Sequence, residues 1–147
     1  MAITLAVNNR FKQRILEHHE DHVYKALAIK TGHTGAYNKS SLQVGTPGSG
    51  APSTTNVGTD AVAASGSYGV NGVTLASLVV NLAGDTATVD WGDFSLTGFT
   101  GSIDGWVLYN SSLSGDNIVA TLPASNAPVQ ATAGTVAVTV NGVVSLT

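Results

Sequence analysis

Residues 86–110 read TATVDWGDFSLTGFTGSIDGWVLYN, and most of the fold prediction rests on this stretch. β-Branched and aromatic residues, which fit the pleated surface of a sheet, recur through it. Gly and Asp interrupt these residues at short intervals, as they do where strands meet turns. The pattern predicts three short strands at 86–91, 94–98 and 103–110.

The same alternation of short strands and turns continues on both sides of this stretch. Further strands are expected at 23–30, 59–65, 72–82, 117–122, 134–140 and 143–147. The expected turns are Ala83-Gly84-Asp85, Ser114-Gly115-Asp116-Asn117 and Asn141-Gly142. The last turn is the clearest, because Asn-Gly between the alternating runs TVAVTV and VVSLT is typical of a type I′ hairpin. The seven or eight short strands expected from residue 59 onward predict an all-β fold, a jelly-roll-like β-sandwich.

A short N-terminal α-helix is predicted over residues 8–22. Asn8 or Asn9 can cap its start. Phe11 and Ile15 recur at helical spacing and give the helix a narrow apolar stripe. Such a helix is expected to lie on a body or in a groove, because its stripe is too narrow to form a core alone.

A long loop is predicted over residues 31–58, because GTPGSGAPSTTNVG is dense in turn-forming residues. Connections of this length are often arms or binding loops. The chain is therefore expected to form a single domain, in which residues 1–58 supply a helix, a strand and an extended arm, and residues 59–147 form the β-sandwich body. An ordinary surface loop is the alternative for the same residues.

The composition is that of a folded chain with very little charge. Only 10% of the 147 residues are charged, whereas soluble domains average about 25%. The hydrophobic fraction is 43%, which is too high for a disordered chain. Because isolated monomers generally carry more surface charge for solubility, the composition suggests a surface that partners cover. The chain has no cysteine, which excludes thiolate chemistry and disulfides.

The few charges are divided unevenly along the chain. All six Lys and Arg residues and all four His residues lie within the first 39 positions, with three acidic residues, so this segment carries a net +3. The remaining residues carry six Asp and no basic residue, a net −6. A basic segment on an acidic body predicts electrostatic self-association or docking on an acidic partner. An ordinary cationic helix on an ordinary domain is the alternative.

Two clusters in the sequence contain side chains that can bind metal ions. His18-His19-Glu20-Asp21-His22 is one residue too short for the zinc-protease pattern, so a polar helix end is the preferred interpretation and a metal site shared between subunits is the alternative. A second set of carboxylates has no EF-hand spacing and no Glu, and Asp in Gly-rich connections usually serves turns. This second set comprises Asp85, Asp90, Asp93 and Asp104.

Other catalytic signatures are missing from the sequence. There is no Gly-x-Ser-x-Gly elbow and no phosphate-binding loop. The last 108 residues contain no Lys or Arg that could hold phosphate, and nucleic-acid binding is disfavoured by the net charge of −3. No apolar run reaches the ~20 residues of a membrane span. We therefore expect a protein that has no catalytic residues, no cofactor and no metal site. We also expect it to bind neither nucleic acid nor a membrane.

The order of several short motifs resembles that of small virion proteins of tailed bacteriophages. The motifs are NNRFKQRILEHHED, KALAI, GSYGVNGVTL, DTATVDWGDFSLTG and IDGWVLYN. Proteins of this kind act as head decoration, cement or tail-fibre-like proteins. The resemblance implies a structural protein without catalysis and without a cofactor.

On this resemblance the chain is expected to be a capsid cement or decoration protein. It would form a homotrimer, clamp neighbouring copies of the major capsid protein, and lie on the outer surface of a virion assembled in the host cytoplasm. The residues expected at interfaces are Arg10, Phe11, Arg14, Ile15, Tyr37, Trp91 and Phe99. The alternatives are a tail or head-fibre or adaptor subunit, and a carbohydrate-binding module that uses Trp91 with its neighbouring aspartates as an exposed platform.

Overall fold

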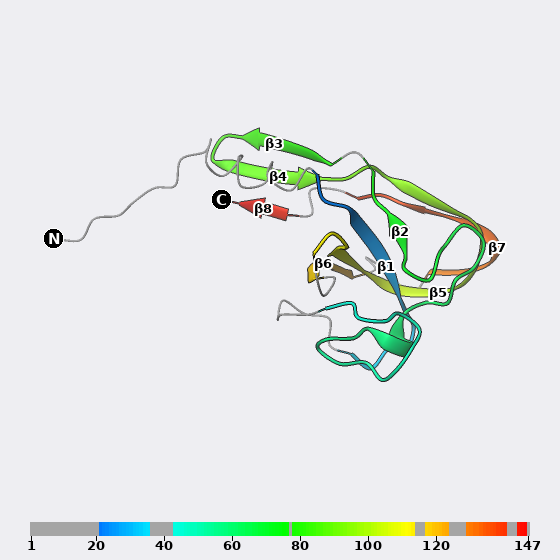
Figure 1. Ribbon diagram of the computed structural model, residues 1–147. Coiled ribbons are helices and arrows are strands. Elements are labelled where there is room, and N and C mark those ends of the chain that lie inside the picture. The colour runs from blue at the N-terminus through cyan, green and yellow to red at the C-terminus, as the bar shows by residue number, and fades with distance from the viewer. Residues whose placement is uncertain are drawn as a thin grey trace. The chain divides into compact units, whose positions relative to one another are not determined.

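The computed structural model of the chain is all-β, as predicted (Figure 1). It describes residues 21–35, 43–76, 78–113, 117–123, 129–140 and 144–146, with only the backbone for 117–123 and 144–146. The strands are β1 Tyr24–Lys30, β2 Val73–Thr74, β3 Val79–Ala83, β4 Thr86–Asp90, β5 Phe94–Asn110, β6 Asn117–Pro123, β7 Val129–Val138 and β8 Val144–Leu146. A 3-10 turn, η1, spans Gly58–Asp60. Most of the helix predicted over 8–22 lies outside the described residues.

The chain divides into two compact units. The first contains the segments Ala76–Gly92 and Thr139–Thr147, and the second contains His22–Leu75 and Asp93–Val138. The first unit holds a sheet in the order β3-β4-β8, and the second holds a sheet in the order β2-β1-β5-β6, with β7 also paired to β5. All of these strand pairs are antiparallel.

β5 is the centre of the second unit. β1 pairs along one edge of its C-terminal half, while β6 and then β7 follow one another along the opposite edge. The two strands predicted at 94–98 and 103–110 are in fact this one strand of 17 residues. The glycines between them do not end the strand, because shifts in register between Leu96 and Gly101 absorb the irregularity as bulges.

Two other predicted strands also differ from the structure. Residues 59–65 form no strand: η1 is followed by Ala61, which bridges Ile29 in β1, and by Val62, whose N–H donates to the Ala28 carbonyl oxygen at 3.0 Å. The run predicted at 72–82 is divided between β2 and β3, which belong to different units. β-Branched residues therefore marked extended backbone correctly, but not where each strand begins and ends.

Two buried rings of the core of the second unit, Tyr68 and Phe99, pack with the partly buried rings of Phe94 and Trp106. Tyr68 lies edge-to-face against Phe99 and Trp106, with ring centroids 5.8 and 6.4 Å apart, and Phe94 meets Trp106 at 5.4 Å. Such perpendicular pairs stabilise a core beyond their buried area. The aliphatic core residues around them include Leu27, Ile29, Val57, Leu96, Ile103 and Val107.

The long loop is folded upon itself over residues 43–60, which corrects the expectation of an extended arm for this part. Its backbone closes through hydrogen bonds such as Val57 N–H to Val44 O at 2.8 Å and Thr59 N–H to Gly50 O at 3.0 Å. The Asn56 side chain binds four backbone groups, those of Thr46, Ser49, Ala51 and Gly58. These local bonds replace the contacts that a strand partner would give. Residues 36–42 lie outside the described part.

Residues on both sides of the predicted domain division at position 58 belong to the second unit. Val57 and Ala61 lie on either side of it, and both contribute to the same core. The loop is thus held to the β-rich body by its own apolar residues. The division of the chain at residue 58 stays a prediction.

The first unit contains one turn that was predicted correctly. β3 and β4 form a hairpin in which Ala83 is paired with Thr86, so Gly84 and Asp85 make a two-residue turn. The predicted hairpin between 134–140 and 143–147 is wrong, because β7 pairs with β5 whereas β8 pairs with β4. An alternating run of valines predicts a strand, but it does not determine which other strand pairs with it.

Candidate functional site

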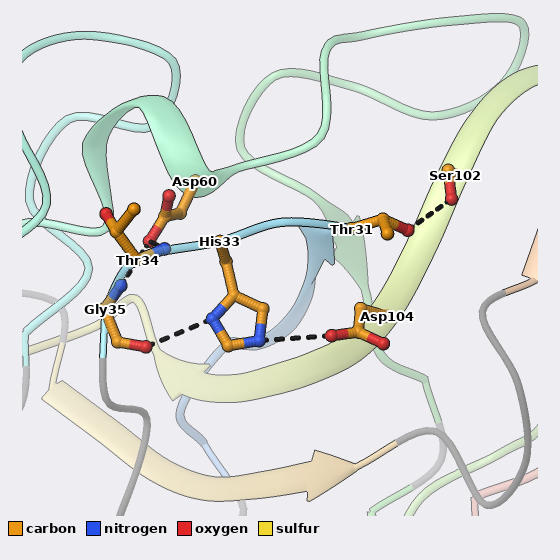
Figure 2. A network of polar contacts seen from close by, with 7 residues as sticks. All are labelled: Thr31, His33, Thr34, Gly35, Asp60, Ser102 and Asp104. Carbon is orange, nitrogen blue, oxygen red and sulfur yellow. Dashed lines mark hydrogen bonds and ion pairs between the residues drawn. The ribbon is translucent and has the colours of Figure 1, made fainter.

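A cluster of polar residues joins the segment after β1 to η1 and β5 (Figure 2). We call it the His33 cluster. Its members are Thr31, His33, Thr34, Gly35, Asp60, Ser102 and Asp104. Ser102 and Asp104 both belong to β5, where the Ser102 hydroxyl bonds to that of Thr31 and the Asp104 carboxylate contacts His33. The whole cluster lies within the second unit.

Asp60 holds the chain that follows β1. Only 2% of this residue is exposed, and its Oδ2 accepts hydrogen bonds from the N–H groups of Thr34 at 3.0 Å and Gly35 at 2.7 Å. A buried carboxylate is tolerated only where donors compensate for its lost hydration. The two amides supply donors for Asp60 and at the same time fix the loop that carries His33.

His33 has an acceptor at each ring nitrogen. Nε2 lies 3.1 Å from Asp104 Oδ2, and Nδ1 lies 3.1 Å from the Gly35 carbonyl oxygen. Both partner atoms are oxygens that accept hydrogen bonds, so the imidazole ring is held from two sides. The two side chains are 33% and 37% exposed, and solvent at this level of exposure weakens an ion pair to about 1 kcal/mol or less.

The geometry of the His33 cluster does not match a nucleophilic triad. In a triad, one imidazole nitrogen faces the carboxylate and the other faces the attacking hydroxyl. Here the nitrogen opposite Asp104 contacts a backbone carbonyl, while the hydroxyls of Thr31 and Ser102 bond to each other. Within the described ranges, no group of three or more His, Cys, Asp or Glu side chains could hold a metal ion. The cluster is arranged to connect segments of chain.

A second polar group ties the start of β1 to the end of β5. The Asn110 Nδ2 amide donates to His22 Nδ1 at 2.8 Å and to Tyr24 Oη at 3.4 Å, and its Oδ1 accepts from Ser112 N–H at 3.0 Å. Because the amide nitrogen only donates, His22 accepts this hydrogen bond at Nδ1. Burial raises the pKa of the Tyr24 phenol.

Tyr68 supplies the outer edge of β1 with a hydrogen-bond partner. Its buried hydroxyl accepts the Ala28 N–H at 2.9 Å, between the part of β1 paired with β2 and the bridge at Ala61. Burial raises the pKa of Tyr68 well above its ordinary value of 10.0. The phenol thus stays protonated and acts as a structural acceptor.

Most of the predicted interface residues lie outside the described part of the chain: Arg10, Phe11, Arg14, Ile15 and Tyr37. The other two, Trp91 and Phe99, are 4% and 0% exposed. Phe99 belongs to the core of the second unit, and this burial argues against its predicted interface role. Trp91 is equally unsuited to be the exposed aromatic platform of a carbohydrate site.

Sequence reasoning did not single out His33 or Asp60. The two are 27 positions apart, and the cluster also includes β5 residues about 70 positions from the loop. Neither residue lies in a short motif of known chemistry. Asp60 follows a Gly-rich run, where an Asp ordinarily suggests a turn. Only the pairing of β1 with β5 brings these residues together.

Two strands expose surface without charge. In β7 the exposed residues are Val129, Gln130, Thr132, Ala133, Thr135 and Ala137. In β3 four of the five residues are exposed, and Val79 and Leu82 are 48% and 40% exposed. A surface of this kind is suited to van der Waals and backbone contacts with another protein, because these strands have no charged groups that would lose their hydration on binding.

Comparison with known proteins returned no match for the sequence among protein-family models, none among curated proteins, and none for the fold among solved structures. The resemblance to virion proteins therefore stays a prediction. Among the described residues, no helix is both long and apolar enough to cross a membrane.

Proposed function

We propose that this protein is a non-enzymatic structural subunit of a tailed-bacteriophage virion, located on the outer surface of the capsid as a cement or decoration protein. It self-associates, with a homotrimer as the expected form, and clamps neighbouring copies of the major capsid protein. The observation that carries this proposal is the distribution of charge: every Lys and Arg lies in the first 39 residues, and only 10% of the whole chain is charged.

The exposed strands support this proposal. The exposed residues of β7 carry no charge, and most of them are small or β-branched. A protein that covers joints between capsid subunits needs broad neutral surfaces of this kind, while a basic segment directs it to an acidic partner. A closed ring of copies also matches the local symmetry of such joints.

The His33 cluster supports a structural role over an enzymatic one. Both His33 nitrogens contact acceptors, and Asp60 binds backbone amides. A general base needs a nitrogen or oxygen within reach of a proton to be removed from a substrate. These contacts instead hold the loop after β1 against β5.

Two alternative functions can be distinguished from a role as capsid cement by what each requires. A tail or head-fibre or adaptor subunit would use the same neutral surfaces at another place in the virion. A carbohydrate-binding module would need an exposed aromatic platform, and the 4% exposure of Trp91 counts against it.

The experiment that tests the proposal is co-sedimentation of the purified chain with empty heads and, separately, with tails of the virus that encodes it. We expect binding to heads, together with a higher melting temperature of the decorated heads. Binding to tails alone would support the fibre or adaptor alternative. Binding to neither, with retention on a glycan array, would overturn the virion proposal.

A further inference from the structure

The outer edge of β3 is open within the described part of the chain. β3 lies at the end of the sheet order β3-β4-β8 (Figure 1). A two-residue hairpin is flanked by a hydrogen-bonded pair, here Ala83 with Thr86, and every second pair from there is also hydrogen-bonded. The backbone N–H and C=O groups of Val80 and Leu82 therefore point away from β4, and no hydrogen bond joins them to another described residue.

This edge has none of the features that usually prevent strand addition. Its sequence, VVNLA, contains no charged residue and no proline, and its pairing with β4 is regular without a bulge. Natural edge strands are commonly protected by lysine, proline or bulges. Two of its apolar side chains, Val79 and Leu82, are about half exposed at 48% and 40%. The chemistry of the edge fits an extended strand of equally low charge.

We propose that this strand is the β3 of a second copy of the chain, paired antiparallel with Asn81 opposite Asn81. Val80 and Leu82, whose backbone groups point outward, lie one position before and one position after Asn81. This register therefore places Val80 of each copy opposite Leu82 of the other. Each of these pairs then exchanges both N–H···O bonds across the two-fold axis. Because β3 carries no charge, two copies approach without repulsion.

The pairing does not depend on the proposed virion role. Two five-residue strands bury less than the ~800 Å² per partner of a standard interface, so the contact is weak between free molecules. A surface that holds copies side by side would strengthen it by raising their effective concentration. On a capsid, a two-fold contact of this kind would link one ring of copies to the next.

Disulfide trapping tests the pairing even if it is weak. The chain has no cysteine, so Asn81→Cys introduces a single thiol in each copy. Directly opposed residues of an antiparallel pair have Cβ atoms about 4.5–5.5 Å apart, close to the separation that a disulfide needs. The matched control is Asn71→Cys, which changes an exposed asparagine in the second unit. We expect Asn81→Cys to form covalent dimers several-fold faster than the control, and equal rates would overturn the proposal.

Charge complementation provides a second, independent test. Asn81→Lys and Asn81→Asp place like charges opposite each other, so each variant alone should sediment as a smaller species than the wild type at high concentration. An equimolar mixture of the two should recover the association. If either variant associates as strongly as the wild type, the proposed register is wrong. Capsid binding by variants that no longer pair would leave the proposed function intact, so the two proposals can fail separately.

Discussion

At the scale of single residues, the stability of the second unit depends on polar groups that complete the backbone of β1. Tyr68 is the clearest case, because its hydroxyl takes the place of a strand partner for the Ala28 N–H. The sequence did not predict a core role for Tyr68. The role of its hydroxyl follows from the spatial position of β1.

Removing that hydroxyl should destabilise the fold. Tyr68→Phe leaves the buried Ala28 N–H without its acceptor, which should lower the free energy of unfolding by about 1–3 kcal/mol. The control is Tyr109→Phe, which removes a hydroxyl that donates to the carbonyl oxygen of the exposed Asn71 in a part-buried hydrogen bond. The control should cost less, because water can replace that bond. Chemical denaturation of both variants measures the difference, and equal losses would contradict this role of Tyr68.

The same phenol should make stability depend on alkaline pH. Burial raises the pKa of Tyr68 in the folded state, so above its ordinary value of 10.0 the unfolded chain releases a proton that the folded chain keeps. The contribution of the Tyr68 phenol to the free energy of unfolding is therefore complete below pH 10.0. Above this pH it falls by about 1.4 kcal/mol per pH unit. The stability advantage of the wild type over Tyr68→Phe should shrink between about pH 9 and about pH 11. A constant advantage across this range would disprove the linkage.

At the scale of elements, glycines determine how closely the segment before β2 approaches β1. Gly72 has a φ of +78°, and a Cβ built at this position would lie 2.1 Å from the Ala26 carbonyl oxygen. Gly32 has a similar φ of +75°, but a Cβ there would meet no atom within 4 Å. A side chain at either position would strain the backbone, but only at Gly72 would it also collide with β1.

Alanine at these two glycines should have unequal effects. Gly32→Ala should cost about 1–2 kcal/mol, the ordinary penalty of a left-handed backbone conformation. Gly72→Ala should cost clearly more, since the new methyl group also forces the β1 backbone away. Thermal unfolding of the two variants gives the comparison, and similar melting temperatures would show that the β1 contact is not rigid.

At the scale of the whole molecule, the proposed docking depends on the basic N-terminal segment. Arg10→Ala combined with Arg14→Ala should weaken binding to empty heads by about threefold to tenfold, with a smaller salt dependence, because two cations of the basic segment are lost. Lys25→Ala combined with Lys30→Ala removes the same charge from β1 and is the control. Co-sedimentation over a range of salt concentrations measures both. Equal weakening by the two pairs would indicate a general charge effect without a specific docking segment.

The sequence by itself determined the all-β class, the positions of β1, β4 and β6 within about two residues, and a hairpin turn at residues 83–85 after β3. These features depend on neighbouring residues, because side-chain alternation and turn chemistry act locally. Tertiary structure alone decided that β5 is one bulged strand, that β7 and β8 pair with different partners, and that His33 meets Asp104. Pairing and burial depend on residues distant in the chain, and a single sequence carries no local signal for which strands meet.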